Sequence, residues 1–399
     1  MRDHLWWGTS ALEHFQGHWY SFYPIAGPVL VTPLYLPALA FPSLREQSPE
    51  TLIAIARIAE KFIAVALAAG ASVLMLRLLQ GLAPRRWAWG IALVFALGTS
   101  TWSLSSQALW QHTFGPVAII ESLYGLMRWE TEAAENRWLW VCGAGAGIAL
   151  VIRPTNLWLL LALVAALWVR RTGIRNYARL LTPVLVLAVP WALYNWLVFH
   201  RLTGGYQWQY GNLVKGLVGL LVSPGRGLLV YIPVVFFALA VWLPAAQANR
   251  RKHRSLVTAC AVFTALHFLT IAAWFSWWGG FCWGPRYLAE MIAPLVILIG
   301  VAVPALQSRG WGLSFAGVAV YCCLIQALGV YFYPKGRWDL LPVSVDSHPE
   351  RVWDWADNPI IRTARGGLVW EPYVIVTTAA LQGIPAAAQK LRQYGIHAY

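Results

Sequence analysis

Charge is scarce in this chain of 399 residues. Asp, Glu, Lys and Arg together make up 12% of the residues, whereas 59% are hydrophobic and the mean hydropathy is +0.55. Apolar runs that are long enough to cross about 30 Å of hydrocarbon recur throughout the chain. The runs are continuous rather than alternating, which excludes a closed barrel. The sequence therefore predicts an all-α, polytopic membrane protein with one membrane domain.

Acidic residues are especially few, with 16 Asp and Glu against 30 Lys and Arg, which leaves a net charge of +14. This excess does not indicate nucleic-acid binding, because the basic residues cluster in short loops between apolar runs. The three basic segments are 77–86, 170–179 and 250–254. Basic loops of this kind are retained on the cytoplasmic side of a membrane, so we expect all three to be cytoplasmic.

Cysteine is also sparse and gives no pattern. The five cysteines are scattered, with neither the spacing of a metal site nor that of a disulfide framework. The first 23 residues are aromatic and polar, unlike a signal peptide, and no internal repeat is visible. No cofactor is predicted from these residues.

The apolar runs predict ten or eleven membrane segments. The first run carries three prolines, so we expect it to be either a full span or a re-entrant segment. The predicted segments are 25–41, 58–80, 87–103, 113–128, 137–152, 156–170, 179–199, 227–246, 255–275, 287–306 and 311–333.

The most informative stretch is Trp-Trp-Gly-Gly-Phe-Cys-Trp-Gly-Pro-Arg-Tyr at 277–287, between two apolar runs. Glycines allow a ligand to approach the backbone closely, and aromatic side chains suit a half-wet surface. Arg286 is costly at membrane depth unless it meets an anion or water. The stretch indicates a site for an anionic, lipid-borne ligand. The alternative is an interfacial aromatic belt with a snorkelling arginine.

Other unusual segments are, like the stretch 277–287, separated from the basic loops by an odd number of predicted spans. They are therefore predicted on the outer face. They include His112, the segment 153–156, the loop 200–226 and the tail after residue 333. Within the loop, the turn 223–227 leaves free backbone amides beside Arg226, an arrangement that suits a phosphate. A site on the outer face accounts for these segments together.

Four short motifs in this order resemble bacterial integral-membrane glycosyltransferases of the GT-C superfamily, near the protein O-mannosyltransferase and aminoarabinose-transferase groups. The resemblance covers nearly the whole chain. The motifs are Gly-His-Trp-Tyr-Ser-Phe-Tyr-Pro at 17–24, Ser-Pro-Gly-Arg-Gly-Leu-Leu at 223–229, Trp-Trp-Gly-Gly…Gly-Pro-Arg-Tyr-Leu at 277–288 and Trp-Asp-Trp at 353–355.

The resemblance implies transfer of a sugar, such as a hexose, from a polyprenyl-phosphate donor to a lipid, glycan or protein acceptor. The site would face the periplasm or exterior of a multi-pass protein in the inner (plasma) membrane. No nucleic acid is expected, and a divalent metal stays open as a cofactor. The alternatives without bond chemistry are a polyprenyl-lipid transporter or flippase and a non-catalytic envelope subunit.

Such a reaction needs a carboxylate or another base to activate the acceptor and cations to stabilise the departing phosphate. The candidates divide by role. The catalytic candidates are Glu13, Asp3 and His18, with His112 as a further base; the substrate-binding candidates are Arg286, Arg226, Tyr20, His112, Arg153, Trp277, Trp278 and Tyr287.

The sequence departs from the resembled family at its start. In that family a first span precedes an outer loop that carries an early acidic residue, whereas here only Asp3 and Glu13 precede the matching motif. We therefore expect that the first span and the catalytic acid are missing. The expected organisation is an outer-loop remnant at 1–23, a helical bundle at 24–333 and an outer cap at 334–399.

Overall fold

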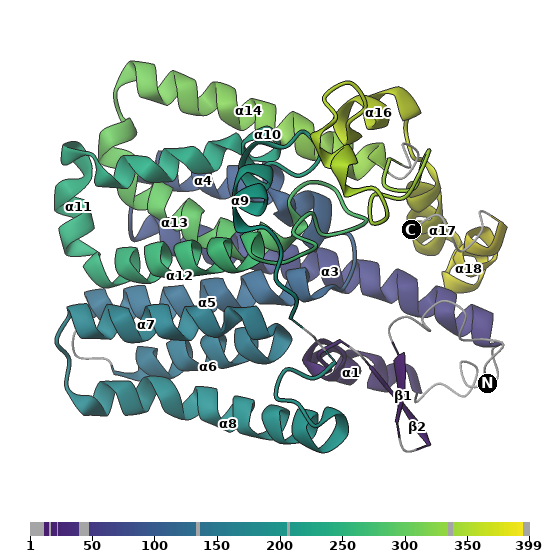
Figure 1. Ribbon diagram of the computed structural model, residues 1–399, viewed down its shortest axis with the longest axis horizontal. Helices are drawn as coiled ribbons and strands as arrows, with labels where there is room; N and C mark the ends of the chain where they lie inside the picture. The colour runs from purple at the N-terminus through teal and green to yellow at the C-terminus, as the bar shows by residue number, and fades with distance from the viewer. Residues whose placement is uncertain are drawn as a thin grey trace.

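The computed structural model describes residues 12–15, 17–21, 23–39, 48–132, 136–205, 208–333 and 338–393. Within these ranges most of the chain is helical, as the continuous apolar runs predict. Long helices lie side by side along the longest axis of the molecule (Figure 1). The sheet found in these ranges is an antiparallel hairpin of two strands, which the sequence did not predict.

The hairpin consists of β1 (Leu12–Phe15) and β2 (His18–Ser21). The helices up to residue 199 are α1 (Ala26–Leu39), α3 (Pro49–Gln80), α4 (Arg85–Leu97), the π-helix η3 (Thr101–Ser105), α5 (Gln111–Thr131), α6 (Arg137–Ile152), η4 (Pro154–Asn156), α7 (Leu157–Val169) and α8 (Ile174–Phe199). The later helices are α9 (Leu213–Val222), α10 (Leu228–Tyr231), η5 (Pro233–Trp242), η6 (Pro244–Ala246), α11 (Gln247–Lys252), α12 (Arg254–Ala272), η7 (Arg286–Leu288), α13 (Ala289–Leu306), α14 (Arg309–Tyr331), η8 (Pro349–Trp353), α16 (Pro359–Gly366), α17 (Glu371–Gln382) and α18 (Ile384–Gln393).

Five helical stretches among the described residues are long and apolar enough to cross a membrane, and the other apolar helices are shorter. The five are Thr51–Gln80, Ile174–Phe199, Arg254–Ala272, Arg286–Leu306 and Arg309–Tyr331. Each of the eleven apolar segments expected from the sequence coincides with helical structure. The chain is an all-α, polytopic membrane protein.

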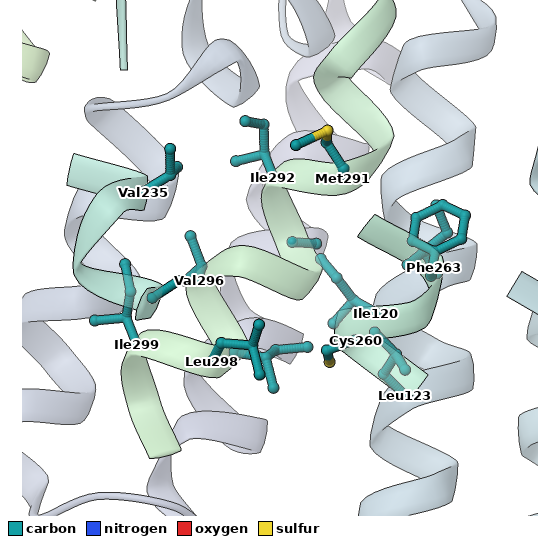
Figure 2. Packing of buried hydrophobic residues seen from close by; sticks show 14 of the residues in the cluster. Ile120, Leu123, Val235, Cys260, Phe263, Met291, Ile292, Val296, Leu298 and Ile299 are labelled. Carbon is teal, nitrogen blue, oxygen red and sulfur yellow. The ribbon is translucent and has the colours of Figure 1, made fainter. Parts of the chain in front are cut away.

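Helix α13 forms the centre of the bundle. Apart from Glu290 in its first turn, its sequence is apolar on every face, the pattern of a helix that is buried all round, and it packs against α5, α12, α4 and η5. Figure 2 shows Met291, Ile292 and Val296 of this helix meeting residues of the neighbouring helices such as Ile120 and Phe263. Residues at the start of α13 are thereby held at the centre of one end of the bundle.

The basic segments gather at one end, near α11 (Figure 1). The amide of Asn249, beside the third basic segment, lies 3.5 Å from the carbonyl oxygen of Leu82, within the first. Arg170, in the second, donates to Ser255 at 3.3 Å. The alternation of spans expected from the basic loops is therefore seen in the structure, and we call this end the basic end.

The hairpin and the tail lie at the opposite end of the bundle (Figure 1). The part of the tail at 338–353 covers the turn 223–227, where the Gly225 amide donates to the carbonyl of Val352 at 3.0 Å. Trp338, Val345 and Val352 are fully buried. The segment 338–353, called the cap below, is thus packed onto the bundle.

Candidate functional site

The candidate site lies at the N-terminal end of α13. Gly284 and Pro285 end the preceding loop, and the short helix η7 then places Arg286 and Tyr287 directly before the first turn of α13. Gly284 has φ +65, and a Cβ there would lie 2.9 Å from the Tyr231 ring, so only glycine fits this turn. The turn fixes the direction in which the two side chains leave the helix.

Glu290, in the first turn of α13, is the centre of a buried ionic cluster. Its carboxylate is fully buried; Oε1 lies 2.9 Å from Nδ1 of His112, and Oε2 lies 2.8 Å from a guanidinium nitrogen of Arg153. His112 belongs to the first turn of α5, and Arg153 follows the last residue of α6. The cluster therefore joins the ends of three helices, with the negative charge near the positive end of the α13 dipole.

The contacts of Glu290 fix the proton on His112. An arginine at 2.8 Å favours the ionised carboxylate, which can only accept hydrogen bonds. Nδ1 of His112 must then carry the proton and donate to Glu290. In a neutral imidazole this leaves Nε2 as an acceptor. The Glu290–His112 pair can therefore offer a base at Nε2, held in orientation by the carboxylate.

Tyr287 lies between two guanidinium groups. Arg153 is 5.1 Å and Arg286 is 5.2 Å from the centroid of its ring, and both contacts have cation–π geometry. The Tyr287 carbonyl accepts a hydrogen bond of 2.9 Å from Nε2 of His267, on α12. Tyr287 thus connects the Glu290 cluster with Arg286.

Arg286 differs from Arg153 and Arg226, each of which is paired with a carboxylate. Its guanidinium lies 5.0 Å from the ring of Trp110 as well as against Tyr287, yet no carboxylate among the described residues pairs with it. Its Nε is buried and has no hydrogen-bond partner. A half-buried cation with an unused Nε–H donor can bind an anion.

Arg226 is fully buried in a second cluster and has no unused nitrogen. It donates to the carbonyls of Trp278, Gly225 and Gly280 at 2.8, 2.8 and 2.7 Å, and to the Asp339 carboxylate at 2.5 Å. Asp339 also accepts from the Tyr333 hydroxyl. Burial and then the nearby Asp339 carboxylate raise the pKa of Tyr333, so the hydroxyl stays protonated as a donor. This cluster fastens the cap to the bundle.

The structure brings four of the predicted binding residues together, namely His112, Arg153, Arg286 and Tyr287. Arg226 was expected to hold a phosphate in the same cleft, but its donors are consumed by the cap and by neighbouring carbonyls. Its interior position thus gives it a structural role.

The two tryptophans predicted to stack on the substrate also hold the cap. Trp277 is 3% exposed and its ring lies 6.1 Å from that of Trp353, so it has no free face for a sugar or a prenyl chain. Trp278 donates from Nε1 to Asp346 at 2.9 Å. The loop 277–284 is therefore a packing surface for the cap, and only its last residues lead into the site.

Of the remaining predicted residues, Glu13, His18 and Tyr20 belong to the strands of the hairpin. Tyr20 packs against Phe199 with 6.4 Å between ring centroids, and His18 on the same strand is exposed. Among the contacts of described residues, none joins them to the Glu290 cluster. Glu13 pairs with Tyr20 in the hairpin register, and its side chain, like all of Asp3, lies outside the described residues.

In the described part of the chain, no three His, Cys, Asp or Glu side chains are grouped as metal ligands would be. The carboxylate that the site does contain, Glu290, was missed by the sequence reasoning. It is the one acidic residue in its apolar segment, four residues after Arg286. An ionisable residue within a membrane segment is a functional candidate in its own right, and that signal was available.

An apolar pocket begins directly beside the cluster. It has a volume of about 620 Å³, and its lining includes Pro154 and Thr155, which follow Arg153 in the chain. The rest of the lining is mostly aromatic and aliphatic. These residues come from α7, α9, α12 and the loop before α9, and are Leu157, Trp158, Trp208, Tyr210, Leu213, Leu266, Leu269, Thr270 and Ala273.

No family model and no curated protein matches this sequence. Two solved structures are similar to it: ArnT from Cupriavidus metallidurans in the apo state, with 17% identity and a TM-score of 0.46, and the same protein bound to undecaprenyl phosphate, with 18% identity and a TM-score of 0.47. Each similarity covers 85% of this chain, and 60% and 61% of the respective ArnT chain. The chain thus spans about three fifths of the length of these neighbours.

Proposed function

We propose that the chain binds a polyprenyl-phosphate-linked sugar at the start of α13 and transfers the sugar to a lipid, glycan or protein acceptor on the non-cytoplasmic face. The motif resemblance implies this reaction class. The observation that carries the proposal is the unpaired state of Arg286. Of the three arginines around this site, Arg153 is paired with Glu290 and Arg226 with Asp339, whereas Arg286 has no carboxylate partner among the described residues.

The surroundings of Arg286 favour a phosphate. A charge at membrane depth is costly unless it meets a counter-ion or water, and the N-terminal end of α13 adds a positive dipole. Trp110 and Tyr287 flank the guanidinium, which restrains its plane. A planar guanidinium in a fixed orientation matches the geometry of a phosphate. The apolar pocket beside Arg153 would take part of the prenyl chain.

His112 and Arg286 would divide the chemistry between them. The acceptor oxygen forms a bond to the anomeric carbon, and the bond from that carbon to the phosphate oxygen breaks. Nε2 of His112 takes the acceptor proton, while Glu290 stabilises the imidazolium that results. Arg286 stabilises the phosphate that leaves with the electron pair.

A second candidate function is binding of the lipid phosphate without transfer, as in a transporter or an envelope subunit. One observation favours it: Glu290 is fully buried and both of its oxygens are engaged. It cannot itself reach an acceptor, so transfer by this chain depends on His112.

Both functions require binding of the lipid phosphate, so a binding measurement tests them together. The detergent-purified chain would be titrated with undecaprenyl phosphate, and binding would be followed by native mass spectrometry. Charge-assisted hydrogen bonds contribute about 1.5–3 kcal/mol each, so Arg286→Ala should weaken binding roughly 10- to 100-fold. Arg286→Lys should lose part of the affinity because the forked geometry is gone. Arg309→Ala, an exposed arginine at the basic end, is the matched control. Unchanged binding by Arg286→Ala would overturn the proposal.

Turnover separates the two functions. Undecaprenyl-phosphate-mannose and undecaprenyl-phosphate-aminoarabinose would be incubated with the chain in membranes, and release of undecaprenyl phosphate would be followed. Transfer predicts that His112→Gln abolishes release while undecaprenyl phosphate still binds. Binding by the wild type without release from either donor would favour the second function.

A further inference from the structure

A second pocket is lined by the end of α7, the start of α8 and the turn between them. This turn lies at the basic end of the bundle (Figure 1). The pocket has a volume of about 900 Å³. Its lining combines one arginine, one threonine and four apolar or aromatic side chains, of which Tyr177 also carries a hydroxyl. The lining residues are Trp168, Val169, Arg171, Thr172, Ile174 and Tyr177.

The two adjacent arginines of this loop have different surroundings. Arg170 is paired with Glu130 at 3.2 Å and donates to Ser255 at 3.3 Å, so its charge is used within the bundle. Arg171 has φ +55, the left-handed region, and its exposed side chain lines the pocket. No acidic side chain among the described residues pairs with Arg171. The pocket therefore has a net positive wall.

The polar groups beside Arg171 are also unused. The Thr172 hydroxyl is buried and has no hydrogen-bond partner. Gly173 precedes α8 and supplies no side-chain cap to the first amides of this helix of 26 residues. A guanidinium, a hydroxyl and helix-end amides are all donors, and together they match the acceptor oxygens of a phosphate.

The rim of the pocket is apolar and faces outward. Trp168 is 76% exposed and Ile174 is 81% exposed, which is unfavourable for such side chains in water. At the boundary of a membrane the same side chains contact acyl chains, and tryptophan is enriched at that level. Hydrogen-bond donors together with exposed apolar side chains fit a molecule with a charged head and a hydrocarbon tail.

We propose that this pocket binds an anionic phospholipid, with the lipid phosphate on Arg171 and Thr172 and an acyl chain along Trp168 and Ile174. The site is independent of the proposed transfer reaction, because it shares no residue with the Glu290 cluster. The basic end is the end predicted to face the cytoplasm, where anionic lipids contribute a negative surface potential. The occupant would fasten the α7–α8 turn to that leaflet.

Native mass spectrometry of the full chain in detergent tests this, with phosphatidylglycerol and phosphatidylcholine as separate probes. One basic residue near an anionic surface is worth about 1 kcal/mol, or roughly fivefold in affinity. We expect Arg171→Gln to weaken phosphatidylglycerol binding about fivefold and Arg171→Lys to retain most of the affinity. The double variant Arg171→Gln with Thr172→Val should bind phosphatidylglycerol more weakly than Arg171→Gln alone. Arg309→Gln, also exposed at the basic end, should leave it unchanged.

Three results would overturn the proposal: equal binding of both lipids by the wild type, an equal loss in Arg171→Gln and Arg309→Gln, or displacement of phosphatidylglycerol by millimolar glycerol phosphate. The last would mean that a soluble phosphate is the ligand. The melting temperature of each variant is measured first. Because Gln keeps a polar, unbranched side chain and removes the charge, a loss of phosphatidylglycerol binding at an unchanged melting temperature reports the site itself.

Discussion

Glu290 neutralises the charge of Arg153, and the pair is buried. Removing one member of a buried ion pair leaves the other uncompensated and costs about 3–5 kcal/mol. We therefore expect Glu290→Gln to lower the melting temperature of the detergent-solubilised chain markedly, because the Arg153 charge remains. The double variant Glu290→Gln with Arg153→Met should recover part of the loss. A single variant as stable as the wild type would show that the charges are compensated elsewhere.

His253, between α11 and α12 at the basic end, gives a pH prediction. Burial, and then the positive charges of Lys252 and Arg170, lower its pKa from the ordinary 6.5 to about 4. In the unfolded chain the imidazole binds its proton near pH 6.5, whereas in the folded chain it does so only near pH 4. Between these two pH values the unfolded state binds more protons, so lowering the pH shifts the equilibrium toward it. Stability should fall as pH decreases from about 6.5 through 4, by on the order of 2 kcal/mol.

Melting temperatures at pH 7.5 and pH 5 check this prediction. His253→Gln removes the titrating group, so the difference between the two pH values should shrink relative to the wild type. An equal acid sensitivity in both proteins would assign the effect to other groups.

Much of the candidate site was predictable from single residues, but not its centre. His112, Arg153, Arg286 and Tyr287 stand out because charged and aromatic side chains beside apolar runs are unusual. Glu290 was overlooked because it lies inside an apolar run. Trp277 was expected to stack on the substrate, and the structure places it under the cap. A tryptophan that packs under a cap and one that binds a ligand occur in the same kind of sequence.

At the scale of elements, α5 and α6 approach each other through glycine. A Cβ on Gly145 would lie 2.6 Å from the carbonyl oxygen of Ala118 and 2.7 Å from the amide of Ser122. Both are backbone atoms, which cannot move aside cheaply. Small residues at such contacts allow membrane helices to pack closely.

Gly145→Ala should therefore destabilise the chain by about 1–3 kcal/mol, the usual cost of overpacking. Gly70→Ala in α3 is the matched control, because nothing lies within 4 Å of a Cβ there. The control should be neutral or gain roughly 0.5–1 kcal/mol from helix propensity. Melting temperatures of the two variants compare the effects, and equal shifts would contradict the role given to the α5–α6 contact.

The positions of the helices followed from apolar runs, since burying backbone groups in lipid requires helices. The hairpin β1–β2 did not, because its residues are aromatic on both faces and show no period of two. The helices of the tail, α16 to α18, were not anticipated either. They are short, and short helices depend on packing that a sequence alone does not reveal.

At the scale of the molecule, the Arg226–Asp339 pair holds the cap on the bundle. Asp339→Asn would leave Arg226 buried without a counter-charge, so we expect the cap to open locally. Hydrogen exchange should then rise in the segments 338–353 and 277–284, while the core of α13 stays protected. Glu350→Gln changes an exposed acid of the same cap and should leave exchange unchanged.

Unaltered exchange in Asp339→Asn would mean that the aromatic contacts of the cap are sufficient without the ion pair.

The gathering of the basic loops at one end was predictable from charge alone. The turn 223–227, the loop 277–284 and the cap meet around the buried side chain of Arg226. Side-chain packing between distant segments decided this, and it has no local signature in the sequence.

The most direct test of the account is an experimental structure of the chain with undecaprenyl phosphate bound. The account predicts the phosphate about 3 Å from the guanidinium of Arg286, the hydrogen-bond distance of such a pair. It also predicts that Arg153 stays on Glu290 and Arg226 on Asp339. A phosphate held elsewhere, with Arg286 unchanged between Trp110 and Tyr287, would contradict the central claim.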